Sequence, residues 1–409
     1  MSLRPKTVLI LATLDTKGEE ALFLKREIEG KGLRTMTMDV GVKGEPYFEP
    51  EIPRQEVAQA VSQTVEGLLA LQDEAKAMGE MARGAERIVS RLQREGTIDG
   101  AIAVGGTIGT ALALKVLQVL PVGFPKVMVS TVAISPYVSP QEVGTDVVLY
   151  QAASDFWGLN RLVRRDLERA ASAMASAVEV EGLKKQEAPL VAITTLGSSW
   201  LKYTFRLKEV LQREGYEVVV FHSVSMQGAI MERLIRDGEI KGLLDLCPIE
   251  VLAEIAGGDC CSPGRMKAAA EKGIPQIVGP GGIGVFPWRF VHALPERFKG
   301  RRVRAHSGIV FAVKATKEEM VETARAMASR LNRSKGPVTV VVPTKGFFGP
   351  DDVGGYFYDP EGRKAFIETL RAALRPDINF ISLDCHINDP EYAEKVAEVA
   401  LELLGEGDR

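Results

Sequence analysis

The stretch that decides the fold is VLILATLDTKGEEALFLKREIEG, which runs from Val8 to Gly30. It opens with a continuous apolar run to Leu14 and continues as an amphipathic helix that ends at Gly30. An unbroken run of Val, Ile and Leu is typical of a strand that is buried on both faces, as in a parallel sheet. The stretch therefore predicts a strand, a turn at Thr13–Gly18 and a helix.

The same alternation of strand and helix continues along the chain. In the first half, apolar runs follow at 34–40, 100–106, 126–131 and 146–150. A second series includes 190–197, 216–222, 241–246, 274–282, 307–315, 337–343 and 378–384. The polar stretch 179–189 separates the two series, and 409 residues exceed what one core usually holds. We therefore predict two doubly wound, Rossmann-like α/β domains with mainly parallel sheets, at 1–184 and 185–409.

Composition narrows the classes of partner and compartment. The net charge is -3, so the chain has no global attraction to nucleic acid or to an anionic membrane. No apolar run reaches the length that a bilayer requires. The four cysteines form no C-x-x-C pair, so a structural zinc site is not expected. We expect a reduced, cytoplasmic protein that binds neither nucleic acid nor membrane and has no metal site of its own.

The first turn carries polar residues that suit a phosphate-bearing ligand. Ligands of open α/β sheets bind outside the carboxyl ends of the strands, where the next helix presents free N–H groups and a positive dipole end. Thr13 and Thr16 can donate to phosphate oxygens, Lys17 adds charge, and Gly18 lets the backbone approach closely. Asp15 can hold Mg²⁺, cap the helix or orient Lys17. The alternative is that Asp15 or Thr16 is only a helix cap.

Two later features support a nucleotide. Asp39 ends the second strand, where a dinucleotide-binding fold keeps its ribose-binding acid about 20 residues after the turn, although it could be a solvated strand end. The stretch AVGGTIGTAL (103–112) is a glycine-rich turn whose backbone N–H groups suit a phosphate. Its candidate residues are Gly105, Gly106, Thr107, Gly109 and Thr110. It lacks the strict G-x-G-x-x-G register, and the alternative is a tight turn that needs small residues for packing.

Three residues of the second half are candidates for proton transfer. His222, Glu250 and His386 come from three separate strand ends, which the doubly wound arrangement brings to one edge. Together with the loop Gly279–Gly284 they predict a site for a small acid or a phosphate. Each also has a structural interpretation, because a single histidine at a strand end is more often hydrogen-bonded within the protein.

The motifs together resemble one family. They are Thr13-x-Asp15-Thr16-Lys17-x-x-Glu20, Gly105-Gly106-x-x-Gly109-Thr110, FYDPEGR (357–363) and HINDP (386–390). They resemble the two-domain family that includes the N-terminal region of the plant tomato mosaic virus resistance protein, over nearly the whole chain. The resemblance implies two Rossmann-like domains, ATP binding and self-association. Plant members carry a further TIM-barrel-like region that is absent here, which leaves room for a separately encoded barrel protein as a partner.

A crowded aromatic loop adds to the expectation of a homodimer. The stretch GFFGPDDVGGYFYDP (346–360) holds five aromatic residues, Phe347, Phe348, Tyr356, Phe357 and Tyr358. A loop rich in Gly and Pro is not expected to bury all of them locally, and exposed aromatics are common anchors of interfaces.

The function that the sequence favours is ATP binding, possibly with Mg²⁺, in a dimeric protein with a ligand crevice at its strand ends. ATP-dependent or hydrolytic activity on a small molecule is one version of this hypothesis. One alternative is a regulatory or protein-interaction module in which ATP only stabilises the binding-competent state. The other is a small-molecule sensor without nucleotide. Whether the protein is an enzyme stays open at this point.

Overall fold

The computed structural model describes residues 4–180, 188–289, 294–306, 308 and 310–406. The chain divides into two compact units, Met1–Lys185 and Gln186–Arg409. Most of the polar stretch proposed as the boundary, residues 181–187, lies outside the described residues.

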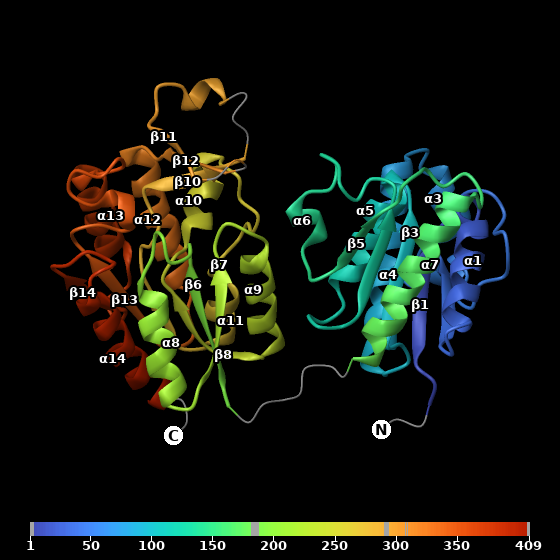
Figure 1. Cartoon of the computed structure of the whole chain (residues 1–409), viewed down its shortest axis with the longest axis horizontal. Coiled ribbons are helices and arrows are strands. Elements are labelled where there is room, and N and C mark those ends of the chain that lie inside the picture. The colour runs from blue at the N-terminus through green and yellow to red at the C-terminus, as the bar shows by residue number, and fades with distance from the viewer. Residues whose placement is uncertain (1–3, 181–187, 290–293, 307, 309, 407–409) are drawn as a thin grey trace. The chain divides into compact units, whose positions relative to one another are not determined.

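The first unit contains one five-stranded parallel sheet with the order β2-β1-β3-β4-β5. Its strands are β1 (Thr7–Ala12), β2 (Arg34–Asp39), β3 (Gly100–Gly105), β4 (Lys126–Ser130) and β5 (Val148–Gln151). Its helices are α1 (Gly18–Glu29), α2 (Arg54–Gln59), α3 (Val65–Ala70), α4 (Glu74–Arg94), α5 (Thr107–Gln118), α6 (Pro140–Val143) and α7 (Arg161–Glu179). Helices cover both faces of the sheet (Figure 1), with α1 packed on α7 and α4 packed on α5.

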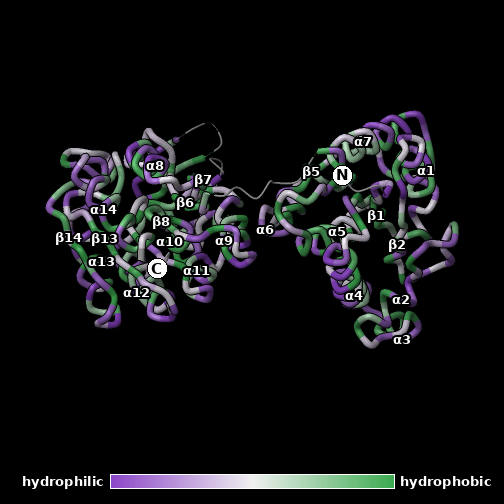
Figure 2. Tube along the Cα trace, turned by 90° about the horizontal axis from the view of Figure 1, so that it is seen from below, coloured by the Kyte–Doolittle hydropathy of each residue, from purple (hydrophilic) through white to green (hydrophobic). Residues whose placement is uncertain are grey.

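The alternation of side chains along β1 explains why both faces are covered. Val8 and Ile10 belong to the apolar cluster with Leu24 of α1 and Leu167 of α7. Leu9, on the opposite face, is also fully buried. Figure 2 shows the hydrophobic residues concentrated in the strands and the hydrophilic residues on the outer sides of the helices. Burial of apolar surface from both faces, at about 25 cal/mol per Å², stabilises this arrangement.

The second unit contains a six-stranded parallel sheet with the order β14-β13-β9-β8-β6-β7. Its strands are β6 (Leu190–Thr195), β7 (Glu217–His222), β8 (Ile240–Asp245), β9 (Gln276–Val278), β13 (Val338–Pro343) and β14 (Asn379–Leu383). Its helices are α8 (Tyr203–Arg213), α9 (Gln227–Asp237), α10 (Ile249–Ala256), α11 (Ala268–Lys272), α12 (Lys317–Leu331), α13 (Pro360–Ala373) and α14 (Pro390–Glu406). Two short 3-10 helices lie at Glu296–Phe298 and Gly349–Asp351.

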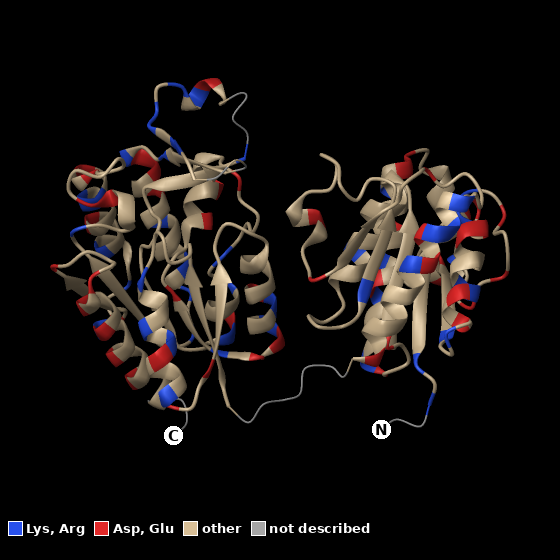
Figure 3. Cartoon of the chain, in the orientation of Figure 1, with Lys and Arg blue, Asp and Glu red and all other residues tan. Residues whose placement is uncertain are grey.

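The predicted fold class is confirmed, with one addition. A small antiparallel sheet of β10 (Val285–Trp288), β12 (Phe311–Lys314) and β11 (Val303–Ala305) extends from the second unit. The apolar run that contains β12 was expected in the parallel series, and that expectation was wrong. Figure 3 shows charged residues of both signs interspersed over the helices of each unit, in line with the low net charge.

The aromatic loop after β13 is folded inward. Phe347, Phe348 and Phe357 are at most 1% exposed, so they are not available as interface anchors. Phe348 stacks on Trp200 with the ring centroids 5.4 Å apart. The expectation of exposed aromatics was wrong for these three, because the loop folds back over the carboxyl edge of the sheet; Tyr356 is the member that remains exposed.

Candidate functional site

The two predicted nucleotide turns lie side by side in the first unit. The order β2-β1-β3-β4-β5 reverses its direction between β1 and β3, and these strands pair in parallel with Leu11 opposite Ala103. The turns that follow them, Thr13–Gly18 and Gly105–Thr110, therefore leave the sheet at the same place. In sheets of this order the reversal is the usual ligand crevice.

Two helix amino ends lie at this reversal without side-chain capping bonds. Lys17 is the N-cap residue of α1 and Gly106 that of α5, and neither makes a side-chain capping bond. The alternative that Asp15 or Thr16 caps the first helix was therefore wrong. Free N–H groups and the positive dipole ends of both helices favour an anion here.

The polar side chains of the first turn contact one another and the loop after β5. The hydroxyl oxygens of Thr13 and Thr16 lie 2.9 Å apart. The Lys17 ammonium donates to the carbonyl oxygen of Phe156 at 2.5 Å and lies 6.0 Å from the ring centroid of Trp157. Lys17 is thus at the predicted site, with its charge directed toward this loop.

Asp39 has a structural role in this arrangement. It is fully buried, and its carboxylate accepts hydrogen bonds from the backbone N–H groups of Leu14 and Gly41 and from Arg54 Nε at 2.6 Å. No oxygen of a ribose can reach a carboxylate that is occupied in this way, so the geometry does not support its predicted ribose-binding role. Asp15 lies beside this pair with a buried oxygen, Oδ1, that makes no hydrogen bond. Burial raises the pKa of Asp15, Arg54 opposes this shift, and Asp39 adds to it.

The glycines of the two turns divide into packing and open positions. A Cβ at Gly18 would lie 2.1 Å from the Tyr47 Cβ, so Gly18 serves close packing. The prediction that Gly18 allows a ligand to approach the backbone is not supported. Gly105 is likewise packed, against the backbone of Gly109. A Cβ at Gly106 or Gly109 would meet no atom closer than 3.9 Å, so the surface above them is open.

The two threonines of the second turn also differ. Thr107 is exposed, whereas Thr110 is buried and shares a hydrogen bond of 2.7 Å with Ser130. Thr107 is therefore available to a ligand, and Thr110 links α5 to the end of β4.

The three residues predicted for proton transfer lie in separate surroundings. His222 is half-buried, and its Nδ1 accepts from the Val224 N–H at 3.4 Å. Burial and the nearby His306 lower its pKa. Glu250 is buried beside Arg265, and His386 is buried beneath Phe348. Within the described part of the chain no hydrogen bond or ion pair joins any two of the predicted three.

The glycine loop expected to complete their site is occupied as well. The N–H groups of Gly279, Gly281 and Gly282 donate to the backbone carbonyls of Asp245, Leu246 and Phe347. These donors hold the loop against the sheet, so they are not free for a ligand.

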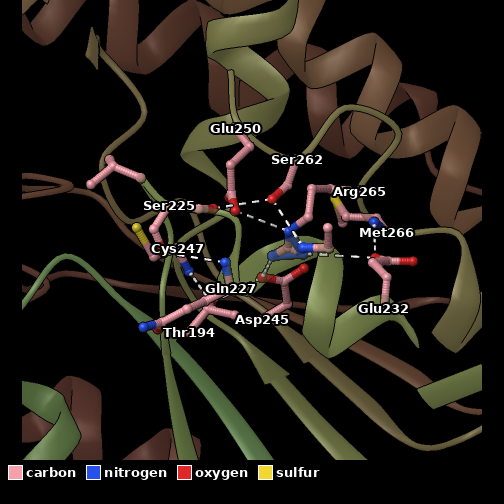
Figure 4. Close-up of polar contacts among 12 residues, drawn as sticks. Thr194, Ser225, Gln227, Glu232, Asp245, Cys247, Glu250, Ser262, Arg265 and Met266 are labelled. Atoms are coloured by element: carbon pink, nitrogen blue, oxygen red, sulfur yellow. Dashed lines mark hydrogen bonds and ion pairs between the residues drawn. The ribbon is translucent and has the colours of Figure 1, made fainter. Parts of the chain in front are cut away.

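A buried charge network occupies the strand reversal of the second unit, between β6 and β8 (Figure 4). Arg265 is 1% exposed, and its guanidinium contacts Asp245 at 2.8 Å, Glu250 at 3.2 Å and Glu232 at 3.7 Å. Thr194 at the end of β6 donates to the same Asp245 oxygen at 2.9 Å. Glu232 also lies 3.6 Å from Arg236, so three carboxyl groups share two arginines and one carboxyl remains in excess in this buried site.

Protonation of one carboxyl relieves this excess. Burial raises the pKa of Glu250 to about 8; Arg265 lowers it in part and Asp245 raises it further. With a pKa of about 8, Glu250 keeps its proton at neutral pH, and its Oε2 makes no hydrogen bond within the protein.

The backbone beside Arg265 is held in an unusual conformation. Met266 has a φ of 65°, in the left-handed region that residues with side chains rarely adopt. Glu232 accepts hydrogen bonds from the N–H groups of Met266 and Ala268 at 2.6 and 2.8 Å. These bonds keep the turn that delivers Arg265 to the strand reversal.

The comparisons with known proteins identify the family. Residues 6–182 match the N-terminal domain of the uncharacterised protein family UPF0261, and residues 188–404 match its C-terminal domain. The chain belongs to the UPF0261 family. The family's protein from Clostridium tetani (strain Massachusetts / E88) is 38% identical over 405 residues, which cover 98% of this chain and 99% of that protein. The Brucella suis biovar 1 member is 35% identical over 401 residues, with coverages of 98% and 96%.

The resemblance to the tomato protein is also found. The ToMV resistance protein Tm-1(GCR237) of Solanum lycopersicum is 32% identical over 337 residues, which cover 80% of this chain and 44% of that protein. Among solved structures, a UDP-N-acetylglucosamine 2-epimerase has a TM-score of 0.25 at 11% identity, covering 99% of this chain and 98% of that one. The Acinetobacter baumannii MurG structure has a TM-score of 0.21 at 12% identity, covering 97% and 100%.

The described parts of this UPF0261 protein contain neither a candidate membrane span nor a candidate metal cluster. None of their helices combines the length and the apolar character needed to cross a membrane. No cluster of three or more His, Cys, Asp or Glu side chains in the same ranges could hold a metal ion.

Sequence reasoning missed Arg54 and Arg265, two of the buried arginines of the UPF0261 chain. Arg54 stands in the first turn of α2, after a proline-rich loop, and Arg265 stands in a turn between two helices. Neither lies at a strand end, where ligand-binding residues were sought. The nearest signal was that Asp39 and Asp245 each end an apolar strand, so each required a partner if buried.

Proposed function

We propose that the first unit binds ATP at the reversal between β1 and β3. The observation that carries the proposal is the pair of uncapped amino ends, those of α1 and α5, which follow adjacent parallel strands. Each helix has 12 residues, long enough for a full dipole, and each offers free N–H groups to a phosphate. The family resemblance supports ATP as the nucleotide.

The residues at the reversal between β1 and β3 would contact different phosphates of the nucleotide. The open backbone at Gly106 and Gly109 and the exposed Thr107 would cradle one phosphate. The hydroxyl groups of Thr13 and Thr16 would donate to another. Lys17 would move its ammonium group from the carbonyl oxygen of Phe156 to a phosphate oxygen, which is a stronger, charge-assisted contact.

A magnesium ion fits this arrangement only through the nucleotide. Mg²⁺ is usually bound by one or two carboxylates together with phosphates and water, where it neutralises phosphate charge. Asp15 is the carboxylate of the turn, and its Oδ1 is buried near Asp39 and Arg54. Its other oxygen, Oδ2, would therefore supply the single protein ligand.

We propose a binding role and not a hydrolytic one. The three residues expected to transfer protons make no contact with one another, and two of them are buried in internal hydrogen bonds and ion pairs. In this proposal ATP stabilises one conformation of the protein. Association as a homodimer, and with a separately encoded barrel protein, is inferred from the family resemblance alone.

Isothermal titration calorimetry with ATP tests the proposal, with and without Mg²⁺. Lys17→Ala should weaken binding by about 1.5–3 kcal/mol, the contribution of a hydrogen bond to a charged group. Lys31→Ala is the matched control, because Lys31 is an exposed lysine of the same unit beyond α1. The absence of ATP binding to the folded wild-type protein at millimolar nucleotide, or equal affinity in Lys17→Ala, contradicts the proposal.

A further inference from the structure

A polar cavity lies in the second unit, far along the chain from the ATP turns. It has a volume of about 740 Å³, within the range of small-molecule sites. Its walls come from the segments that follow β6, β13 and β14, at the carboxyl edge of the six-stranded sheet. The side chains that matter most are Lys202, Lys345, Arg363, Asp352 and Asp389.

A buried arginine lines this cavity with part of its guanidinium unused. Arg363 is 5% exposed. Its Nε donates to the Thr344 carbonyl oxygen at 2.9 Å and its Nη1 donates to Asp351 at 2.8 Å. Its Nη2 makes no hydrogen bond to any residue that the structure describes. Asp351 offsets the charge of Arg363, and the N–H groups of Nη2 remain as donors for an anionic group at the cavity wall.

Two lysines reinforce the positive side of the cavity. Lys202 is exposed at the amino end of α8 and forms no ion pair within the described ranges. Lys345 pairs with Asp384 at 3.1 Å, but these side chains are 55% and 86% exposed, so the pair contributes little. Both ammonium groups are available to a ligand anion.

The floor of the cavity is held rigidly by neutral hydrogen bonds. His386 contacts the Phe348 carbonyl oxygen through Nε2 at 3.2 Å, and its Nδ1 accepts from the Asn388 N–H at 3.1 Å. Asn388 in turn accepts from the Lys202 N–H at 2.8 Å and donates to the Trp200 carbonyl oxygen at 3.1 Å. A cavity fixed in this way loses little entropy when a ligand binds.

Carboxylates on the same walls suit the remainder of such a ligand. Asp352 and Asp389 are exposed acceptors, and each already accepts one backbone N–H bond that fixes its direction. Carboxylate oxygens accept hydrogen bonds from hydroxyl groups and repel anions. A ligand with one acidic end and several hydroxyl groups satisfies both sets of side chains.

We propose that this cavity binds a small hydroxylated anion, of the sugar phosphate or sugar acid class, with its acidic group at Arg363, Lys202 and Lys345. The site is separate from the proposed ATP site and does not depend on it. Phosphate and carboxylate share the chemistry that these cations recognise, so the experiment includes both.

Calorimetry on the full chain with glucose 6-phosphate, glucuronate, glucose and inorganic phosphate tests the proposal. At least one of the two hydroxylated anions should bind, and glucose and phosphate should each bind about tenfold more weakly or worse, because each lacks one set of contacts. The double variant Lys202→Ala/Lys345→Ala should lower the affinity for that anion by about tenfold or more. The exposed pair Lys208→Ala/Lys241→Ala is the charge-matched control and should bind as the wild type does.

Two results would overturn the assignment. One is that neither glucose 6-phosphate nor glucuronate binds at millimolar concentration. The other is equal affinity in Lys202→Ala/Lys345→Ala and the wild type. Lys17→Ala, which tests the ATP site, should leave this binding unchanged, so failure of one proposal is distinguished from failure of the other.

Discussion

The Lys17 ammonium group lies 2.5 Å from the carbonyl oxygen of Phe156, at the point where the loop after β5 meets the amino end of α1. Glu20 strengthens the same junction by accepting the Gly158 N–H at 3.0 Å. Trp157 stands between these two contacts and is 85% exposed. A ligand that takes Lys17 away from Phe156 must therefore change the surroundings of an exposed indole.

The first prediction is a fluorescence signal for nucleotide binding. ATP should change the tryptophan emission of the wild type, and Trp157→Phe should abolish the change because the Trp157 ring lies 6.0 Å from the Lys17 ammonium group. Trp288→Phe is the matched control and should keep the change. A signal that persists at full size in Trp157→Phe would show that it does not arise beside Lys17, and would contradict this prediction.

The second prediction concerns the buried ion pair below the first turn. Arg54→Met removes the partner of Asp39, whose side chain is 1% exposed, and leaves an uncompensated buried charge. We expect the free energy of unfolding to fall by about 3–5 kcal/mol. Arg91→Met is the control: Arg91 pairs with Glu56 at 3.5 Å on the surface, and its loss should cost less than about 1 kcal/mol.

Chemical denaturation measures both variants of this prediction. The double variant Asp39→Asn/Arg54→Met should recover part of the loss, because it removes the stranded charge. If Arg54→Met proves as stable as Arg91→Met, Asp39 is not held as the structure describes.

The order of elements in the first unit could be predicted from sequence because strand and helix periods are local. The end of the apolar run at β1 and the glycine turn after β3 each indicate where a strand ends. The doubly wound rule places both strand ends at one edge of the sheet. The partner of Asp39 could not be predicted in this way. Arg54 reaches it from a helix 15 residues later, after a loop whose path no local pattern describes.

In the second unit, the sequence predicted where the site residues stand but not what they contact. His222 and His386 were placed correctly at strand ends, but position does not reveal hydrogen-bond partners. His386 is enclosed because the aromatic loop after β13 folds over it, and a loop rich in Gly and Pro gives no sign of that direction. Arg363 was missed for the same reason, because its partners Thr344 and Asp351 belong to the loop after β13.

The third prediction is a dependence of stability on pH from Glu250. Its pKa is raised to about 8, from a usual value of 4.5, so the native state keeps a proton that the unfolded chain releases. Stability is therefore highest below the usual value and falls as the pH rises toward 8, by up to about 5 kcal/mol. Glu250→Gln should remove this decline, because the amide does not titrate.

Unfolding free energies at a series of pH values between about 5 and 8 measure the effect, since the slope follows the difference in bound protons. Glu254→Gln is the control, because Glu254 belongs to the same helix and pairs with Arg330 near the surface. An unchanged slope in Glu250→Gln would mean that the excess acid of the Arg265 network is relieved elsewhere.

The fourth prediction separates structure from chemistry at His386. His386→Ala leaves the Phe348 carbonyl oxygen and the Asn388 N–H without their partner, and each orphaned group costs about 1–3 kcal/mol. We expect a loss of about 2–4 kcal/mol in the free energy of unfolding. His306→Ala, at an exposed histidine whose ring meets Trp200 edge-on, should cost about 1 kcal/mol or less. A stable His386→Ala protein would instead favour the catalytic role predicted from sequence.

The fifth prediction uses two glycines of the proposed ATP site that differ in their surroundings. A Cβ at Gly109 meets nothing within 4 Å, so Gly109→Ala should stabilise α5 by up to about 1 kcal/mol. The same methyl group would stand where we propose that a phosphate approaches the backbone, so ATP should bind more weakly to this more stable protein. Gly18→Ala should do the reverse in the free protein and destabilise it, because its Cβ would lie 2.1 Å from Tyr47. Melting temperatures without ligand and calorimetric affinities for ATP separate the two effects, and wild-type affinity in Gly109→Ala would exclude the α5 amino end as the phosphate site.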